Sequence, residues 1–159
     1  MACSIRHGQP RHGQRQPTYN RSMGRPAMDE ACRRHGVLIL YLFGSRADDG
    51  RRMLADERVE KQGSDLDVGV VFERPPGSLE QLSGLQIALE DVFAPLRVDL
   101  VPLDQVDALF QSRAIDGHRV FTSNGHRADV FELNVMRQAA DLLPIQRAIE
   151  RDRFGVSTS

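Results

Sequence analysis

The sequence has little cysteine, and no hydrophobic run in it is long enough to cross a membrane. Cys3 and Cys32 are the two thiols among 159 residues, too few for a disulfide framework, so we expect a reducing, cytoplasmic location. The longest apolar run, 37–43, suits one buried strand, because a membrane helix needs about 20 apolar residues. The N-terminal arginines are not followed by an apolar stretch, so a secretory signal is not expected either.

Acidic residues are missing from the first 28 positions. That segment holds five arginines, so the remaining residues carry 16 basic against 22 acidic side chains. Nucleic-acid backbone binds clustered positive charge, which an acidic body lacks, and direct nucleic-acid binding is therefore not expected. We predict a disordered basic tail over 1–26, a folded domain over 27–150 and a frayed C-terminus over 151–159.

Helix and strand signals alternate along the predicted domain. Apolar runs predict strands over 37–43, 65–72, 97–101 and 117–121. Helical spacing and boundary residues predict helices over 27–34, from a Ser78–Gln81 capping box to before Pro95, from a cap at Asp104, and over 127–143 before Pro144. This order predicts an α/β (α+β) domain built in two or three layers.

Two aspartates open the second predicted strand. Because side chains alternate between the faces of a strand, Asp65 and Asp67 should project from the same side, with Cα atoms about 6–7 Å apart. Carboxylates this close repel each other unless a cation lies between them, and such ligands suit Mg²⁺ or Mn²⁺. Taken alone, the pair is more often a turn cap beside an exposed strand residue.

A Gly-Ser turn favours the functional interpretation. Gly44 and Ser45 follow the buried strand 37–43, where glycine allows a tight turn and the serine hydroxyl with nearby N–H groups can bind phosphate. If 37–43 and 65–72 are antiparallel neighbours, this turn meets the aspartate pair at one edge of the sheet.

Asp99 is the third candidate. It stands inside the apolar run 98–101, where aspartate is disfavoured and is rarely fully buried unless paired or metal-bound. A satisfied structural aspartate is the alternative. Beside the pair at 65 and 67, however, a third metal ligand and general base is the better interpretation. Together these residues predict a two-metal site for phosphoryl transfer.

The motifs resemble those of the polymerase-β-type nucleotidyltransferase superfamily. The segments that carry the likeness are 42–47 (Leu-Phe-Gly-Ser-Arg-Ala), 64–68 (Ser-Asp-Leu-Asp-Val) and 98–101 (Val-Asp-Leu-Val). The small size is similar to that of the minimal nucleotidyltransferases, including the MntA-type antitoxins of type VII toxin–antitoxin systems. The patterns at 127–132 and 140–144 also look like the C-terminal helix of that group.

The resemblance implies a polymerase-β-like fold with a small mixed sheet flanked by helices, ATP as substrate and two Mg²⁺ ions. It further implies transfer of AMP to a tyrosine of a partner HEPN-domain ribonuclease toxin, in a heteromeric complex. Gly44, Ser45 and Arg46 would bind the nucleotide, although Arg46 is about as well explained as a solvated surface residue. The roles of metal ligand and catalytic group would fall to Asp65, Asp67 and Asp99.

Two other functions stay open at this point. One is a small-molecule nucleotidyltransferase of the aminoglycoside-modifying kind, and the other is a catalytically idle antitoxin that neutralises its toxin by contact. The segment 46–64 is longer than is usual in the family. It predicts either a longer helix or a flap over the nucleotide, and it leaves open whether Arg51 or Arg52 reaches the site.

Overall fold

The computed structural model describes residues 24–60 and 63–155, so most of the predicted basic tail lies outside the described residues. The strands are β1 (Val37–Phe43), β2 (Leu66–Phe72), β3 (Val98–Pro102) and β4 (His118–Thr122). In the described part they form one sheet in the order β3-β2-β1-β4, with β1 antiparallel to β2 and β4, and β2 parallel to β3. The predicted mixed sheet is confirmed. β3 and β4 are shifted by one residue from their predicted ranges, and β2 begins one residue later than predicted.

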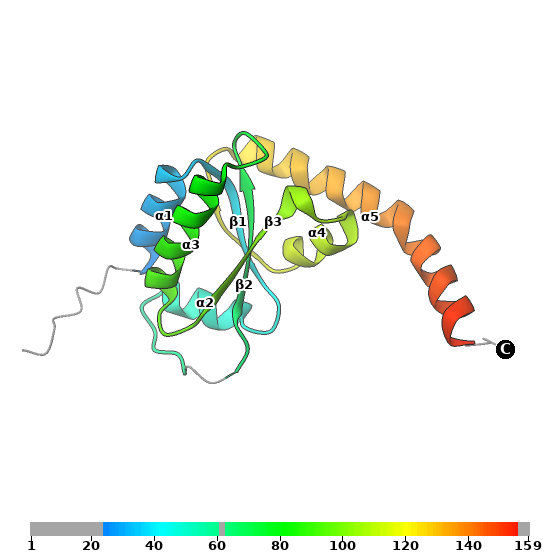
Figure 1. Cartoon of the computed structure of the whole chain (residues 1–159), viewed down its shortest axis with the longest axis horizontal. Coiled ribbons are helices and arrows are strands. Elements are labelled where there is room, and N and C mark those ends of the chain that lie inside the picture. The colour runs from blue at the N-terminus through cyan, green and yellow to red at the C-terminus, as the bar shows by residue number, and fades with distance from the viewer. Residues whose placement is uncertain (1–23, 61–62, 156–159) are drawn as a thin grey trace, which may run out of the picture.

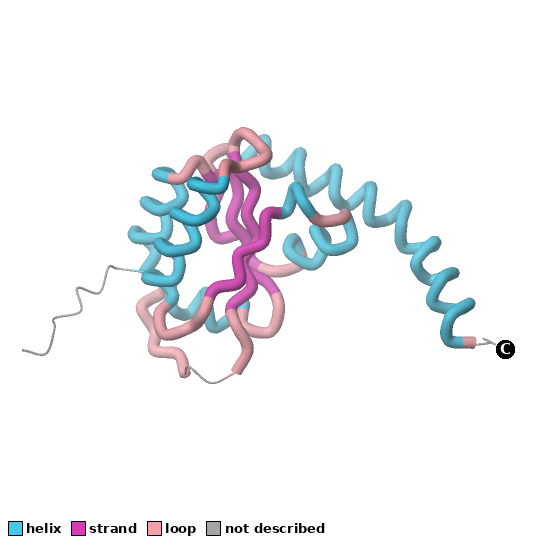
Figure 2. Tube along the Cα trace, in the orientation of Figure 1, coloured by secondary structure: helices cyan, strands magenta, loops and turns pink. Residues whose placement is uncertain are grey.

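Helices cover both faces of this sheet, so the domain has three layers (Figures 1 and 2). The helices are α1 (Gly24–Arg34), α2 (Ala47–Leu54), α3 (Leu79–Phe93), α4 (Ala108–Ile115) and α5 (Gly125–Phe154), with a short 3-10 turn η1 (Leu103–Gln105). α1, α2 and α3 pack on one face, and α4 and α5 on the other. None of the helices described is both long and apolar enough to cross a bilayer.

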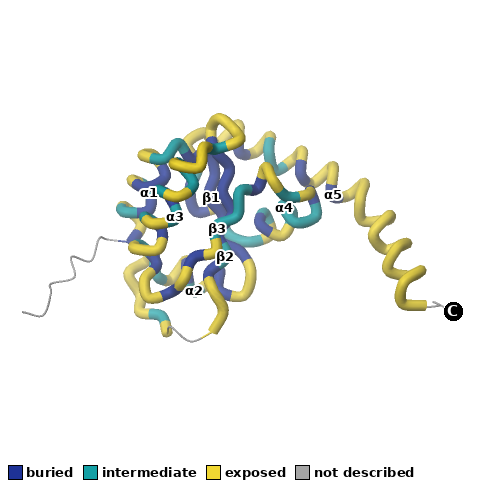
Figure 3. Tube along the Cα trace, in the orientation of Figure 1, coloured by how far each residue is buried: buried dark blue, intermediate teal, exposed yellow. Residues whose placement is uncertain are grey.

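Strand β1 lies at the centre of the core, and all of its residues are buried (Figure 3). Leu40 and Leu42 point into the cluster under α1 and α3, whereas Tyr41 and Phe43 point into the cluster under α4 and α5. Burying each such side chain stabilises the fold by about 1.5–3 kcal/mol. This two-sided burial explains why the strand is apolar throughout and ends where it reaches the polar site.

Three helix starts differ from the prediction, and one of them is that of α5, which begins at Gly125 rather than at 127. α1 begins at Gly24, ahead of the predicted start at 27, and Arg25 ties it to the sheet by donating a hydrogen bond to the Val120 carbonyl at 2.6 Å. Asp104 does not cap the fourth helix. Residues around it form η1, and Asp107 caps α4 by accepting from the Phe110 N–H at 2.8 Å. Asp104 and Asp107 are both suitable N-cap residues. Because Asp104 lies within η1, the helix begins only after Asp107.

The prediction that the last helix ends before Pro144 is wrong. α5 runs through Pro144 to Phe154, so residues 151–154, predicted to be frayed, are also helical. A proline inside a helix removes one hydrogen bond and costs about 3 kcal/mol, but the strong helix formers on both sides of it continue the helix. Gly155 then ends α5 in the left-handed conformation, with its N–H bonded to the Arg151 carbonyl.

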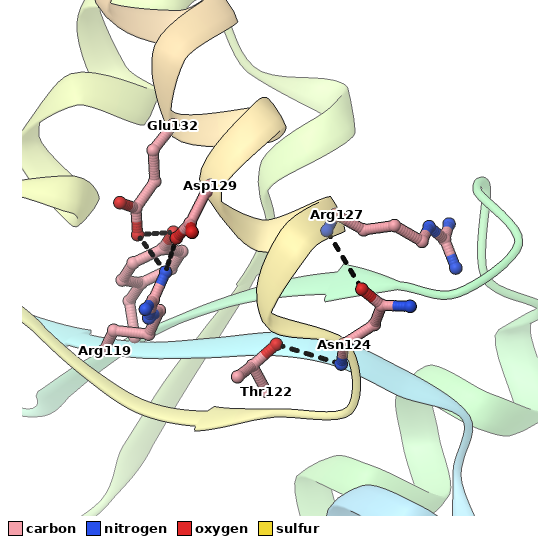
Figure 4. A network of polar contacts seen from close by, with 7 residues as sticks. Arg119, Thr122, Asn124, Arg127, Asp129 and Glu132 are labelled. Atoms are coloured by element: carbon pink, nitrogen blue, oxygen red, sulfur yellow. Dashed lines mark hydrogen bonds and ion pairs between the residues drawn. The ribbon is translucent and has the colours of Figure 1, made fainter.

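A polar network fixes the first half of α5 to the sheet (Figure 4). The Tyr41 hydroxyl on β1 donates to Glu132 Oε1 at 2.8 Å, and Arg119 on β4 donates to Asp129 at 2.9 Å and to Glu132 at 3.2 Å. Burial and then the Glu132 carboxylate raise the pKa of Tyr41 well above its ordinary value. The tyrosine therefore stays protonated and keeps donating.

Tyr41→Phe should lower the free energy of unfolding by about 1–2 kcal/mol, because Glu132 loses a donor in a part-buried position. The folded-state pKa is raised, so the advantage of the wild type is complete below the unfolded tyrosine pKa of about 10 and shrinks as pH rises beyond it. Urea unfolding at pH 7 and pH 10.5 measures both effects. Equal stability of the two proteins at pH 7 would contradict this assignment.

Candidate active site

The Gly-Ser turn lies directly against the carboxylate of Asp67. Gly44 follows β1 with φ +73°, and a Cβ added there would collide with Asp67 Oδ2. In the antiparallel register Phe43 pairs with Asp67, which confirms that the end of β1 meets the start of β2. Only glycine combines this conformation with so close an approach, because the Asp67 carboxylate fills the space that a Cβ would take.

Ser45 and Arg46 join this turn to the segment that precedes β2. The hydroxyls of Ser45 and Ser64 are hydrogen-bonded at 2.8 Å. Arg46 is buried, with 7% of its surface exposed, and its guanidinium donates to Asp49 at 2.6 Å and to the Glu60 carbonyl at 2.7 Å. Arg46 is thus no solvated surface residue, and in this structure its guanidinium ties the start of α2 to residue 60.

The three predicted aspartates lie at the N-terminal ends of two neighbouring strands, β2 and β3. Asp65 directly precedes β2 and is exposed, Asp67 is half-buried within β2, and Asp99 is exposed on β3. Asp67 and Asp99 are register partners in the parallel ladder. Because β3 is an edge strand, Asp99 needs no buried partner, and its position opposite Asp67 is what connects it with the site.

The charges of this cluster act on Asp67. Its pKa is raised above the ordinary value, first because burial disfavours the charged carboxylate and then because Asp99 and Asp65 are negative. Like charges placed opposite each other on adjacent strands destabilise a sheet. A cation bound among the three would remove this repulsion.

The donor set fits Mg²⁺, although it does not form a complete cage. Among the described residues, no three His, Cys, Asp or Glu side chains converge as a ready metal site. Mg²⁺ typically binds one or two carboxylates together with substrate phosphates and water. Carboxylates beside a glycine turn therefore fit an ion that arrives with a nucleotide.

In the long 46–64 segment, the described residues are α2 and, at 55–60 and 63–64, residues without regular secondary structure. A pocket of about 530 Å³ opens between them. Its lining includes Ser64 and three arginines, Arg46, Arg52 and Arg58. Arg51 instead lies beside His118, in a separate pocket toward β4. Of the two neighbouring arginines, Arg52 is therefore the one on the side of Ser64 and the aspartates.

Two contacts near the site were missed by sequence reasoning. His118 Nε2 lies 2.7 Å from Asp48, which joins the start of β4 to the first turn of α2. The bond between Ser45 and Ser64 is the other. Neither has a local signal, because the partners are far apart in sequence. The Arg46–Asp49 pair, by contrast, has the i, i+3 spacing of a helical ion pair and was open to prediction.

Gly44→Ala should lower catalytic turnover about 100-fold, because the new methyl group displaces the Asp67 carboxylate and must adopt an unfavourable positive φ. Gly125→Ala is a matched control, since a Cβ at that helix start meets nothing within 4 Å. The turnover of both variants is measured with their thermal unfolding. Full activity in Gly44→Ala would contradict the close approach described here.

Several solved structures of toxin–antitoxin proteins are similar to this chain in fold. A chain of an MntA–HpeT toxin–antitoxin mutant with two aspartates changed to glutamate is similar at TM-score 0.61 and 16% identity, over 80% of this chain and 96% of that one. A toxin–antitoxin structure with AMP-PNP is similar at TM-score 0.56 and 18% identity, over 80% of this chain and 96% of that one. A chain from a complex of tri-AMPylated HEPN toxin with MNT antitoxin from Shewanella oneidensis is similar at TM-score 0.54 and 17% identity, over 83% of this chain and 97% of that one. At these identities the likeness establishes the fold.

The sequence itself matches a family profile. No curated protein matches the chain. The profile described as polymerase beta, nucleotidyltransferase, however, covers residues 28–126, from α1 to the start of α5. This range includes the Gly-Ser turn and all three aspartates of the site. With most of its domain matched and its carboxylates at the expected sheet edge, the chain belongs to the polymerase β nucleotidyltransferase family and is a nucleotidyltransferase.

Proposed function

We propose that the protein transfers AMP from ATP to a tyrosine hydroxyl of a partner HEPN-domain toxin, and so acts as an antitoxin in a heteromeric cytoplasmic complex. The observation that carries this proposal is the packing of Gly44 against Asp67, with Asp99 opposite Asp67 on the next strand. This arrangement gathers carboxylates beside a Gly-Ser turn, as a metal-dependent reaction of a nucleoside triphosphate would require.

The solved relatives support the choice of substrate and partner. One of them holds AMP-PNP, and in another an MNT antitoxin accompanies a tri-AMPylated HEPN toxin. In the mutant relative the two aspartates changed to glutamate stand two positions apart. Asp65 and Asp67 have the same spacing here, which supports their proposed role as metal ligands.

The proposed reaction is a displacement at the α-phosphorus. The tyrosine oxygen forms a bond to this phosphorus, the bond to the oxygen that bridges to the β-phosphorus breaks, and pyrophosphate leaves with the electron pair. Mg²⁺ held by Asp65, Asp67 and Asp99 would neutralise phosphate charge and lower the pKa of the attacking hydroxyl. We assign the hydroxyl proton to Asp99, the exposed carboxylate opposite Asp67 on β3, and the bound triphosphate to Gly44 and Ser45.

The experiment combines the purified protein, ATP, Mg²⁺ and a HEPN-domain protein encoded beside its gene. Tandem mass spectrometry should locate AMP on a tyrosine of the partner, and the ribonuclease activity of the partner should fall. Asp65→Ala should abolish both changes. Ribonuclease inhibition that persists in Asp65→Ala without any AMP on the partner would instead identify an idle, binding antitoxin.

A further inference from the structure

Strand β3, which carries Asp99, is hydrogen-bonded to the sheet along one side. In the described part of the chain it is an edge strand and pairs with β2 alone. Successive carbonyls of a strand point to opposite edges. The Arg97 carbonyl accepts from the Leu66 N–H of β2 at 2.8 Å, so the next carbonyl, that of Val98, points to the outer edge. The residue directly before Asp99 therefore needs a donor from outside the sheet.

Gln86 on α3 supplies this donor. Its side-chain Nε2 donates to the Val98 carbonyl at 2.8 Å and to Glu90 Oε1, also at 2.8 Å. A carbonyl and a carboxylate only accept, so the nitrogen of the Gln86 amide, and not its oxygen, must face both partners. Glu90 lies one helical turn further along α3 and orients the amide toward the strand.

The helix that carries Gln86 is itself fixed in the core. Leu85 and Leu89 on α3 are fully buried in the cluster beneath α1 and α3, and the capping box of Ser78 and Gln81 fixes the start of the helix. Gln86 is half-buried, and its bond joins this helix to the outer edge of β3. The strand is thus held by β2 on one side and by α3 on the other.

The support matters because the site pushes β3 away from β2. Asp99 and Asp67 are register partners, and the negative charge of Asp99 contributes to the raised pKa of Asp67. Like charges directly opposite each other destabilise the pairing of two strands. An edge strand that carries one of these charges is therefore the element of the site that moves most easily, and Gln86 holds it one residue before Asp99.

We propose that Gln86 is a positioning residue of the nucleotidyltransferase site, which keeps Asp99 opposite Asp67 by holding the Val98 carbonyl. The inference rests on the proposed function for the role of Asp99 as a metal ligand. Residues that orient a ligand without touching the metal typically change metal affinity or activity by about 10–100-fold when they are replaced. Gln86 would belong to this class, because its contact is with the backbone beside Asp99.

The test uses Gln86→Met, which keeps the length of the side chain and removes the donor. Titration calorimetry measures the binding of α,β-methylene ATP, an analogue that cannot release pyrophosphate, with Mg²⁺ and again in EDTA. The variant should bind about 10-fold more weakly with Mg²⁺ and as the wild type does in EDTA. Amide hydrogen exchange of residues 98–101 should also be faster in the variant, because β3 has lost its outer support.

Gln146→Met is the matched control. Gln146 donates to Glu150 four residues later on α5 at 3.1 Å, as Gln86 does to Glu90, but its bond joins no strand. This control should keep wild-type binding and wild-type exchange in β3. All measurements are made well below the melting temperature of each protein, so that a change in stability does not alter the fraction folded.

The outcomes separate the inference from the proposed function. A loss confined to Mg²⁺, together with faster exchange in β3, supports the positioning role even if the wild type transfers no AMP to the HEPN-domain protein, a result that would contradict the proposed function alone. Wild-type affinity in Gln86→Met would overturn the inference. Equal losses with Mg²⁺ and in EDTA would also overturn it, because they indicate a general structural role, and so would a wild type whose binding gains nothing from Mg²⁺.

Discussion

Replacing Asp67 by asparagine is expected to lower kcat for nucleotidyl transfer about 1,000-fold, which corresponds to the several kcal/mol that a catalytic metal supplies to the transition state. Of the three aspartates, Asp67 alone lies on a strand that has another strand on each side. It pairs with Phe43 of β1 and with Asp99 of β3. Asparagine keeps the shape and removes the charge. Steady-state rates at saturating ATP and Mg²⁺ measure this loss.

The same variant should become more stable in the absence of metal. Burial and the charges of Asp99 and Asp65 raise the pKa of Asp67, so its ionisation costs the folded state stability at neutral pH, and this cost disappears as pH falls through the raised pKa. The melting temperature of Asp67→Asn in EDTA should thus exceed that of the wild type at pH 7, with a smaller difference at pH 4. Mg²⁺ with ATP should stabilise only the wild type.

Asp91→Asn is the matched control, since this exposed aspartate on α3 carries the same charge away from the site. It should leave both the rate and the response to Mg²⁺ unchanged. If Asp67→Asn keeps its activity, or if Asp91→Asn loses it, the assignment of the metal site is wrong.

Arg46→Ala is expected to have the second largest effect, lowering kcat about 100-fold and stability by about 2–3 kcal/mol. The variant loses the charge-assisted hydrogen bonds to Asp49 and the Glu60 carbonyl, each worth about 1.5–3 kcal/mol. The freed segment carries Ser64 and Asp65, so its displacement removes a metal ligand from its position. Arg46→Lys, which keeps the charge but cannot form the same fork of bonds, should lie in between.

Two measurements separate this positioning role from the nucleotide-binding role predicted for Arg46. A positioning residue changes kcat and exposes the segment, so trypsin should cleave after Arg58 faster in Arg46→Ala than in the wild type. A residue that only binds phosphate would raise KM for ATP and leave this cleavage unchanged. The second pattern would contradict the positioning role.

Most of the fold follows from local signals in the sequence. The uniformly apolar run 37–43 and the capping box at Ser78 and Gln81 predicted elements that the structure contains, because burial on both faces and reciprocal hydrogen bonds are local requirements. The end of α5 was mispredicted because the effect of Pro144 depends on the rest of its helix. The start of α1 was missed because it is set by contacts with Asp56 and Val120, distant in sequence.

The residues of the candidate site also fall into two groups: those that local sequence predicts and those whose contacts depend on distant parts of the chain. Asp65 and Asp67 could be paired from strand alternation alone, and Gly44 from its place after a buried strand. Asp99 could be proposed from its apolar surroundings, yet its link to Asp67 depends on the parallel register of β2 and β3. The bonds that Arg46 makes depend on the path of the chain after α2, which no short pattern specifies.

The central claim is that these residues transfer a nucleotidyl group to a partner protein. The most direct measurement is a pair of parallel incubations of the protein, Mg²⁺ and the HEPN-domain partner, one with ATP labelled at the α-phosphate and one with ATP labelled at the γ-phosphate. We predict that the α-label becomes attached to the partner while the γ-label is released as pyrophosphate, and that Asp67→Asn prevents both. A γ-label on the partner, or no protein-bound label from either ATP, would contradict the claim.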